Sequence, residues 1–181
     1  MSTENISSPR ERILTVAGQL FYRDGYRAVG IDRIIADSDV AKATFYKYFP
    51  AKDDLIVAWI EAAEKMANAT LPEADVPEPL FAFTDRLIDV AMSPRCLGCT
   101  WQGAASEFVE VSHPAHAKSI EVKERLIAAL ALRAKRQNIH NPSEVANNIF
   151  LLLEGVWASV RMLRSAAPLR GAKAAVRKLA S

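Results

Sequence analysis

Residues 39–55 read DVAKATFYKYFPAKDDL and decide the fold, because they hold a short helix, its stop and the start of a longer helix. Phe45 and Phe49 are four residues apart, so both point the same way from a helix and can anchor it on a core. Pro50 ends this helix, since proline has no backbone N–H and restricts the residue before it. The longer helix begins near Ala51.

The opposite face of the short helix carries groups that suit a nucleic acid. Hydroxyls and a cation lie close together at Thr44, Tyr46, Lys47 and Tyr48. Lys52 stands at the start of the longer helix, where a cation and free backbone N–H groups can together hold a phosphate. Taken alone, the stretch fits equally well an amphipathic helix with a solvated lysine.

The whole chain has the size and composition of a globular protein. Its 181 residues are 50% hydrophobic, enough for one large domain or for a small domain fused to a medium one. We expect residues 1–7 to be disordered. No apolar run reaches the length of a membrane span and the N-terminus has no apolar signal core, so we expect a soluble cytoplasmic protein. Its two cysteines are then expected to be reduced thiols.

Charge is unevenly distributed, although the net charge is only +2. Residues 1–52 carry 8 Lys/Arg against 6 Asp/Glu, residues 53–160 carry 9 against 15, and residues 161–181 carry 6 against none. Because local patches matter more than totals, the weakly basic N-terminal segment says little by itself about nucleic-acid binding. The basic C-terminal segment fits a solvated helical face.

Two further helices precede the opening stretch. The first starts with Ser8 as N-cap, Pro9 in its first turn and Glu11 completing a capping box, and Gly25 ends it. A short second helix fits residues 31–37. Only a few residues separate it from the third helix, which is helix-turn-helix spacing.

The rest of the chain keeps a helical pattern, without the alternation of a strand. A fourth helix from Lys52 to about Ala69 is too long for the head to bury, and the segment 71–79, rich in proline and acids, connects it to more helices. These are expected over residues 80–92, 99–110, 115–138, 142–165 and 169–179. The sequence therefore predicts an all-α protein with a helix-turn-helix head over residues 8–52 and a helical body over residues 53–181.

The helix expected over residues 142–165 has a wider apolar face than a one-sided helix needs. Such a helix buries two faces, one inside its own subunit and one against a partner. The candidates for a homodimer interface are Phe150, Leu153, Trp157 and Val160. The alternative is an interior helix of a monomer.

The N-terminal residues of the chain resemble the TetR family of bacterial one-component transcription regulators. The resemblance rests on the capped first helix ending at Asp24-Gly25-Tyr26, on the Ile34-Ile35-Ala36 segment before the turn, and on KATFYKYFPAK over residues 42–52. It covers about residues 8–60, and in the body it is mainly architectural.

The resemblance implies a homodimer on double-stranded DNA. Each third helix would enter the major groove of one half of a palindromic operator, and the body would be a ligand-binding and dimerisation domain. The positions implied to contact DNA are Arg33, Lys42, Ala43, Thr44, Tyr46, Lys47, Tyr48 and Lys52. An unknown small-molecule effector that fits the body only when helix four is tilted would release the DNA, and DNA would equally weaken effector binding. The expected output is derepression, and activation by ligand is the alternative.

The head departs from the family at several cap and turn positions. Family members commonly have Ser or Thr at the positions of Gly30 and Ala51, Ser at Ala41, and Gly at Asp39 and Ala43. A missing cap hydroxyl costs a helix about 1 kcal/mol, so we expect a head that is more mobile than is usual in the family.

Cysteine and histidine residues of the body offer two alternative sensing chemistries. Cys96-x-x-Cys99 and His113-x-x-His116 together have the residue types of a zinc site. The segment between them fits a helix rather than a finger hairpin, so no metal is expected. A thiol sensor through Cys96 or Cys99 requires a solvent-facing thiol of low pKa. The simplest interpretation is a pair of buried, unreactive cysteines beside a ligand pocket.

An apolar effector pocket is indicated by a set of large side chains, which are Phe81, Met92, Trp101, Phe108 and Trp157. The chain has no glycine-rich phosphate loop, nucleophile elbow or HExxH motif, so we expect neither an enzyme nor a cofactor. The alternative to a ligand-responsive repressor is a DNA-binding adaptor that does not control transcription.

Overall fold

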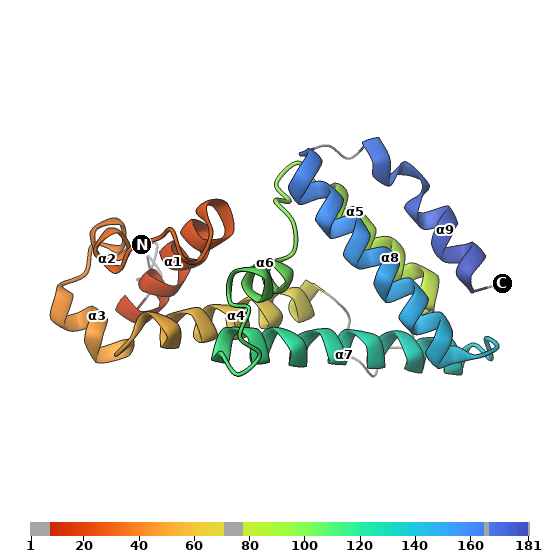
Figure 1. The fold of residues 1–181 in the computed structure, drawn as a ribbon, viewed down its shortest axis with the longest axis horizontal. Helices are drawn as coiled ribbons and strands as arrows, with labels where there is room; N and C mark the ends of the chain where they lie inside the picture. Colours follow the sequence, from red (N-terminus) through yellow and green to blue (C-terminus); the bar gives the residue numbers. More distant parts are fainter. Residues whose placement is uncertain (1–7, 71–77, 165–166, 181) are drawn as a thin grey trace, which may run out of the picture.

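The computed structural model describes residues 8–70, 78–164 and 167–180, and within these ranges it is helical without strands (Figure 1). The predicted all-α fold is confirmed. The expected disorder of residues 1–7 and most of the connection 71–79 lie outside the described residues. The helices are α1 (Pro9–Asp24), α2 (Ile31–Ser38), α3 (Lys42–Tyr48), α4 (Lys52–Thr70), α5 (Leu80–Met92), α6 (Thr100–Glu107), α7 (Pro114–Arg136), α8 (Pro142–Leu163), a 3-10 helix η1 (Ala167–Gly171) and α9 (Ala172–Leu179).

Helix α1 begins and ends as its sequence predicts. The Glu11 N–H donates to Ser8 Oγ at 3.2 Å, and the Ser8 N–H donates to Glu11 Oε2 at 2.8 Å, which completes the capping box. Gly25 ends the helix with φ 94°, a conformation that residues with a Cβ rarely adopt. Both ends of the helix are therefore local properties of the sequence.

The turn between α2 and α3 depends on Asp39, which takes the left-handed conformation with φ 50° and ψ 52°. Its carbonyl accepts a hydrogen bond from Arg12 Nη2 at 3.1 Å, so α1 supports the turn. Phe45 and Phe49 are both buried, as predicted. Phe49 itself has left the helix with φ −136°, because it precedes Pro50.

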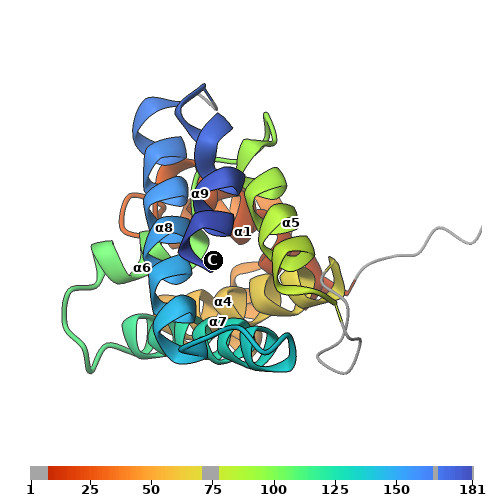
Figure 2. The same ribbon diagram turned by 90° about the vertical axis from the view of Figure 1, so that its right-hand side faces the viewer.

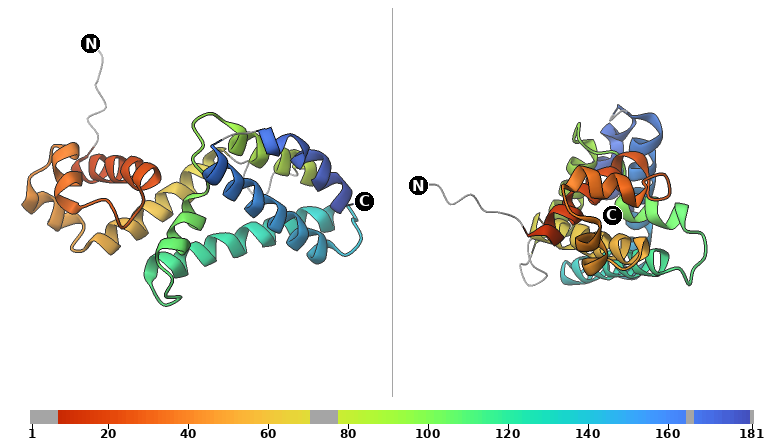
Figure 3. Two further views of the ribbon diagram at one scale, coloured as in Figure 1. Left: turned by 45° about the horizontal axis from the view of Figure 1, so that its top comes forward. Right: turned by 90° about the vertical axis from the view of Figure 1, so that its left-hand side faces the viewer.

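Helix α4 joins the head to the body, where it lies along α7 (Figures 1 and 3). Helices α7 and α8 pack closely, and α9 lies against both α5 and α8 (Figure 2). Ion pairs hold α9 on α5, with Arg177 Nη2 2.6 Å from Asp85 Oδ2 and Lys173 Nζ 2.6 Å from Asp89 Oδ1. The basic C-terminal segment is therefore partly neutralised by α5.

The molecule has two apolar cores, and the boundary between them does not coincide with the expected boundary between head and body. The second core lies wholly in the body, between α5, α7, α8 and α9. The first contains the buried side chains of the head, but it continues into α6 and α7 through Ala104, Phe108 and Ala115. The head thus shares its core with part of the body, which makes the junction a packed interface.

Helix α6 is shorter than the predicted segment 99–110, because the chain turns away at Phe108. The carbonyl of Glu107 accepts a hydrogen bond from Arg27 Nε at 2.7 Å, and Phe108 lies in the core shared with the head. The end of α6 is therefore decided by contacts with residues far away in the sequence.

Candidate nucleic-acid interface

Helix α3 turns one face to the head core and the other to solvent. Phe45 is fully buried, whereas Tyr46, Lys47 and Tyr48 are exposed. At the beginning of the helix Lys42 and Ala43 are exposed as well, and Thr44 is half-buried. The predicted contact residues of this helix therefore form one accessible surface of short, aromatic and cationic groups, which is suited to reading base edges and phosphates.

The cations near this surface differ in how free they are. Lys47 makes no ion pair with the described residues, and its ammonium lies 6.0 Å from the Tyr48 ring centroid. Lys42 Nζ lies 3.6 Å from Asp32 Oδ1 on α2. Exposed pairs of this kind are worth about 0–1 kcal/mol, so a phosphate can compete for Lys42.

Arg33 is held by two acids, with Nη1 3.0 Å from Asp24 and Nε 3.7 Å from Asp37. The pKa of the Asp24 carboxyl is lowered mainly by the hydrogen bond from Arg23 and to a smaller extent by the Arg33 guanidinium. Among the predicted phosphate contacts, Arg33 therefore needs the largest rearrangement before it can bind DNA.

Lys52 lies at the start of α4, as predicted, but it already has a partner. Its Nζ donates to the Arg27 carbonyl at 3.3 Å, in the loop between α1 and α2. Partial burial lowers the pKa of Lys52, since taking the ammonium out of water disfavours its charged form. A phosphate at this position would supply the negative charge that the carbonyl supplies only in part.

The missing cap residues have different consequences along the head. Gly30 and Ala41 are the N-cap residues of α2 and α3, and neither makes a side-chain cap hydrogen bond, as the sequence indicates. At the start of α4, however, Asp54 Oδ2 accepts a hydrogen bond from the Ala51 N–H at 2.9 Å. The carboxylate thus binds a free N–H at the helix start, where the family commonly has a cap hydroxyl.

A groove of about 420 Å³ lies in the body, between α6, α7 and α8. Its walls combine apolar and charged side chains, namely Trp101, Gln102, Ala105, Ser106, Ser119, Ile120, Lys123, Glu124, Ile127 and Glu154. Lys123 forms an ion pair with Glu154, and Gln102 donates to the same carboxylate. The α7 members follow helical spacing, so the periodicity of this segment could have indicated that they share one face.

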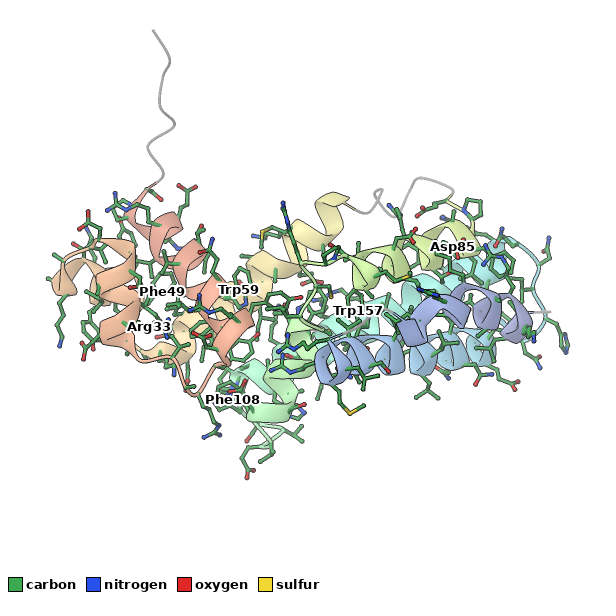
Figure 4. The ribbon with its side chains drawn as sticks, turned by 90° about the horizontal axis from the view of Figure 1, so that it is seen from above. Arg33, Phe49, Trp59, Asp85, Phe108 and Trp157 are labelled. Carbon is green, nitrogen blue, oxygen red and sulfur yellow. The ribbon has the colours of Figure 1, made fainter. Side chains whose placement is uncertain are left out.

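Of the predicted pocket residues, Trp101 lines this groove and the other four do not. Phe81, Met92 and Trp157 pack against the second core of the body. Phe108 lies at the junction with the head, where its ring stacks on His113 at 4.2 Å (Figure 4). Large apolar side chains were therefore poor guides to the groove, because most of them fill cores.

The cysteines and histidines occupy separate structural roles. Cys96 is half-buried beside Tyr22 and Cys99 is buried at the start of α6. His113 accepts a hydrogen bond from the Ala115 N–H and caps α7, while His116 binds the Phe108 carbonyl. Across residues 8–70, 78–164 and 167–180, no three His, Cys, Asp or Glu side chains are grouped so as to hold a metal ion.

The predicted dimer residues are only partly accessible. Leu153 and Val160 are buried in the core of their own subunit, and Phe150 and Trp157 are half-buried. A different stripe of α8 is exposed and apolar, and it consists of Leu151, Gly155, Ala158 and Met162. Leu151 is 66% exposed and Met162 76%, and an exposed apolar patch of this kind can mark an interaction site.

A helix-turn-helix head whose third helix, α3, is accessible defines a class, that of DNA-binding transcription regulators. Residues 13–59 match the family model described as bacterial regulatory proteins of the tetR family. The chain is 28% identical to the HTH-type transcriptional repressor SCO4008 of Streptomyces coelicolor over 88% of this chain and 83% of that protein. It is also 27% identical to the HTH-type transcriptional repressor KstR of Mycobacterium tuberculosis, over 83% and 68% of the two chains.

The crystal structure of SCO4454, a TetR-family regulator of Streptomyces coelicolor, superposes with a TM-score of 0.84 at 26% identity and covers 96% of each chain. Residues 13–59 therefore match the DNA-binding domain of the TetR family, and the whole chain is similar to DNA-binding transcription regulators of this family rather than to enzymes. None of the helices in the described part of the chain is long and apolar enough to cross a membrane.

Proposed function

We propose that the protein is a homodimeric transcriptional repressor of the cytoplasm that a small molecule releases from a palindromic operator. Residues 8–52 bind DNA, and residues 53–181 bind the effector and dimerise. The observation that carries this proposal is the surface of α3, where Tyr46 and Lys47 face solvent while Phe45 anchors the helix in the head core.

Dimerisation through the exposed stripe of α8 supports binding to a palindrome. Two recognition helices must lie about 34–36 Å apart to reach both half-sites in the major groove. A dimer that holds the two heads at this distance binds the operator, and a dimer whose heads lie at another distance dissociates from the DNA. An effector in the groove between α6, α7 and α8 can therefore control DNA binding from a distance, by shifting the dimer between two arrangements.

The test is fluorescence anisotropy with the DNA upstream of the protein's own gene, beside a scrambled duplex, at several salt concentrations. We expect tight binding to the upstream DNA alone. Tyr46→Ala should weaken it by about tenfold or more, and Lys47→Ala should also lower the slope of log affinity against log salt by about one. Lys135→Ala serves as the matched control, because it removes an exposed cation from the far end of α7.

Equal binding to both duplexes would instead support a DNA-binding adaptor without operator specificity. Absence of binding to either duplex, by a protein that is folded and dimeric, would contradict the proposal.

A further inference from the structure

A single carboxylate of the body holds the loop between α1 and α2 of the head. Glu107 Oε1 accepts the Tyr26 N–H at 3.0 Å, and Glu107 Oε2 accepts the Arg27 N–H at 2.8 Å. These two N–H groups are consecutive, so the carboxylate binds the loop backbone in a two-pronged manner. Hydrogen bonds of this type, with a charged acceptor, are roughly twice as strong as neutral ones.

The rest of the loop is built around the same contact. Gly25 has φ 94°, a conformation that favours glycine, and a Cβ at this position would lie tightly against Glu107 Oε1, at 3.0 Å. The Arg27 guanidinium donates to the Glu107 carbonyl and lies 5.1 Å from the Phe108 ring centroid. The Arg27 carbonyl in turn accepts from Lys52, a predicted phosphate contact.

The same helix that ends in this clamp forms one wall of the groove. Helix α6 has eight residues, and Trp101, Gln102, Ala105 and Ser106 of them line the groove. Because eight residues make only about two turns of helix, Glu107 and the groove-lining side chains belong to one short segment. Displacement of its groove face must therefore displace Glu107, which directly follows Ser106.

We propose that Glu107 is a positioning residue that couples the groove to the DNA-binding head. A molecule that enters the groove pushes α6 away from α7 and α8, and the carboxylate then leaves the Tyr26 and Arg27 N–H groups. The freed loop loosens both the packing of α1 on α2 and the position of Lys52. This inference rests on the proposed function and adds to it a route through α6, beside the tilt of α4.

Because the effector is unidentified, a tethered benzyl group serves as the probe. In a Cys96→Ser background, Ser106→Cys reacts with benzyl methanethiosulfonate, so that the thiolate forms a disulfide with the benzylthio group and methanesulfinate leaves. The same label on Ser143→Cys, an exposed position at the start of α8 outside the groove lining, is the matched control. Mass spectrometry verifies labelling, and amide hydrogen exchange reports the Tyr26 and Arg27 N–H groups.

We expect Glu107→Gln to speed exchange of these two amides at least roughly tenfold, because a neutral amide oxygen replaces a carboxylate that served both. Labelling at position 106 should speed the same amides, labelling at position 143 should not, and labelling at 106 should add nothing in Glu107→Gln. That non-additivity separates coupling from a merely structural role.

Unchanged exchange after verified labelling at position 106, or an additive effect in Glu107→Gln, would overturn the proposal. Circular dichroism of every variant confirms that the helices persist. DNA binding is measured separately by anisotropy, so that failure to bind operator DNA contradicts the proposed function while the exchange data still report the clamp.

Discussion

Tyr22 shows how one residue of the head can depend on the body. Its hydroxyl accepts the Leu97 N–H at 2.8 Å and donates to the Gly98 carbonyl at 2.9 Å. Burial raises the pKa of Tyr22 to about 12, so that the phenol remains a neutral donor. The neighbouring Tyr26 is also raised in pKa by burial and donates to the Thr100 carbonyl at 3.1 Å.

We expect Tyr22→Phe to lower the free energy of unfolding by about 1–2 kcal/mol near pH 7, because Leu97 N–H and Gly98 C=O lose a partner. The pKa in the folded protein is higher than the unfolded value of about 10. The stabilisation is therefore complete below pH 10 and is lost as pH rises through the folded pKa. Urea unfolding at neutral and at high pH should show the difference between wild type and variant shrinking above about pH 10.

Tyr48→Phe, which removes an exposed hydroxyl of α3, is the control and should change stability by less than about 0.5 kcal/mol. A difference between wild type and Tyr22→Phe that is independent of pH would contradict the assigned role of the hydroxyl.

At the scale of elements, α2 and α3 are helices with weak beginnings. Their N-cap residues, Gly30 and Ala41, both have extended backbone conformations suited to a cap but lack a side chain that can accept a hydrogen bond. Tertiary anchors hold both helices, since Ile34 and Phe45 are fully buried. Stability of the helix-turn-helix therefore comes from packing more than from its ends.

A cap introduced at Gly30 should strengthen α2. Gly30→Ser adds a hydroxyl within reach of the free N–H groups of the first turn, and a Cβ there meets nothing within 4 Å. We expect thermal unfolding to show stabilisation by a few tenths to about 1 kcal/mol. Ala36→Ser, on the exposed face of the same helix, should instead be neutral or destabilising. Equal changes at both positions would show that a serine cap plays no part.

At the scale of the whole molecule, we expect the exposed stripe of α8 to form the interface of the proposed dimer. A Cβ at Gly155 would meet nothing within 4 Å inside the subunit, so the fold does not require glycine at this position. In the proposed dimer, a residue without a side chain between Leu151 and Met162 would let the partner's helix come close.

Gly155→Leu should therefore weaken the dimer while leaving the subunit folded. Leucine is a better helix former than glycine, so loss of the dimer could not be explained by unfolding of α8. Sedimentation velocity over a range of concentrations should show monomer for Gly155→Leu and dimer for Ala128→Leu, an exposed substitution on α7. A dimer of unchanged affinity in Gly155→Leu would place the interface elsewhere.

The sequence by itself determined the local structure of the head. The capping box of Ser8 and Glu11, the glycine stop at Gly25 and the proline stop at Pro50 act within a few residues, so their effects can be derived from the chain alone. The exposed face of α3 follows from helical spacing once Phe45 and Phe49 are assigned to the core. The class of protein was predicted from the resemblance of residues 8–60 to the TetR family, because the stretch 39–55 alone fits an amphipathic helix equally well.

Only the tertiary structure decided which side chains are accessible in the body. Periodicity places Leu153 and Val160 on the apolar face of α8, but a helix that packs on more than one side can bury either of two stripes. Packing against α5, α7 and α9 buries the stripe that contains Leu153 and Val160. Phe108 likewise packs in the core shared with the head. The Glu107 carboxylate accepts a hydrogen bond from the Tyr26 N–H, 81 residues away in the sequence. Such contacts depend on the relative positions of whole helices, which no local pattern of residues encodes.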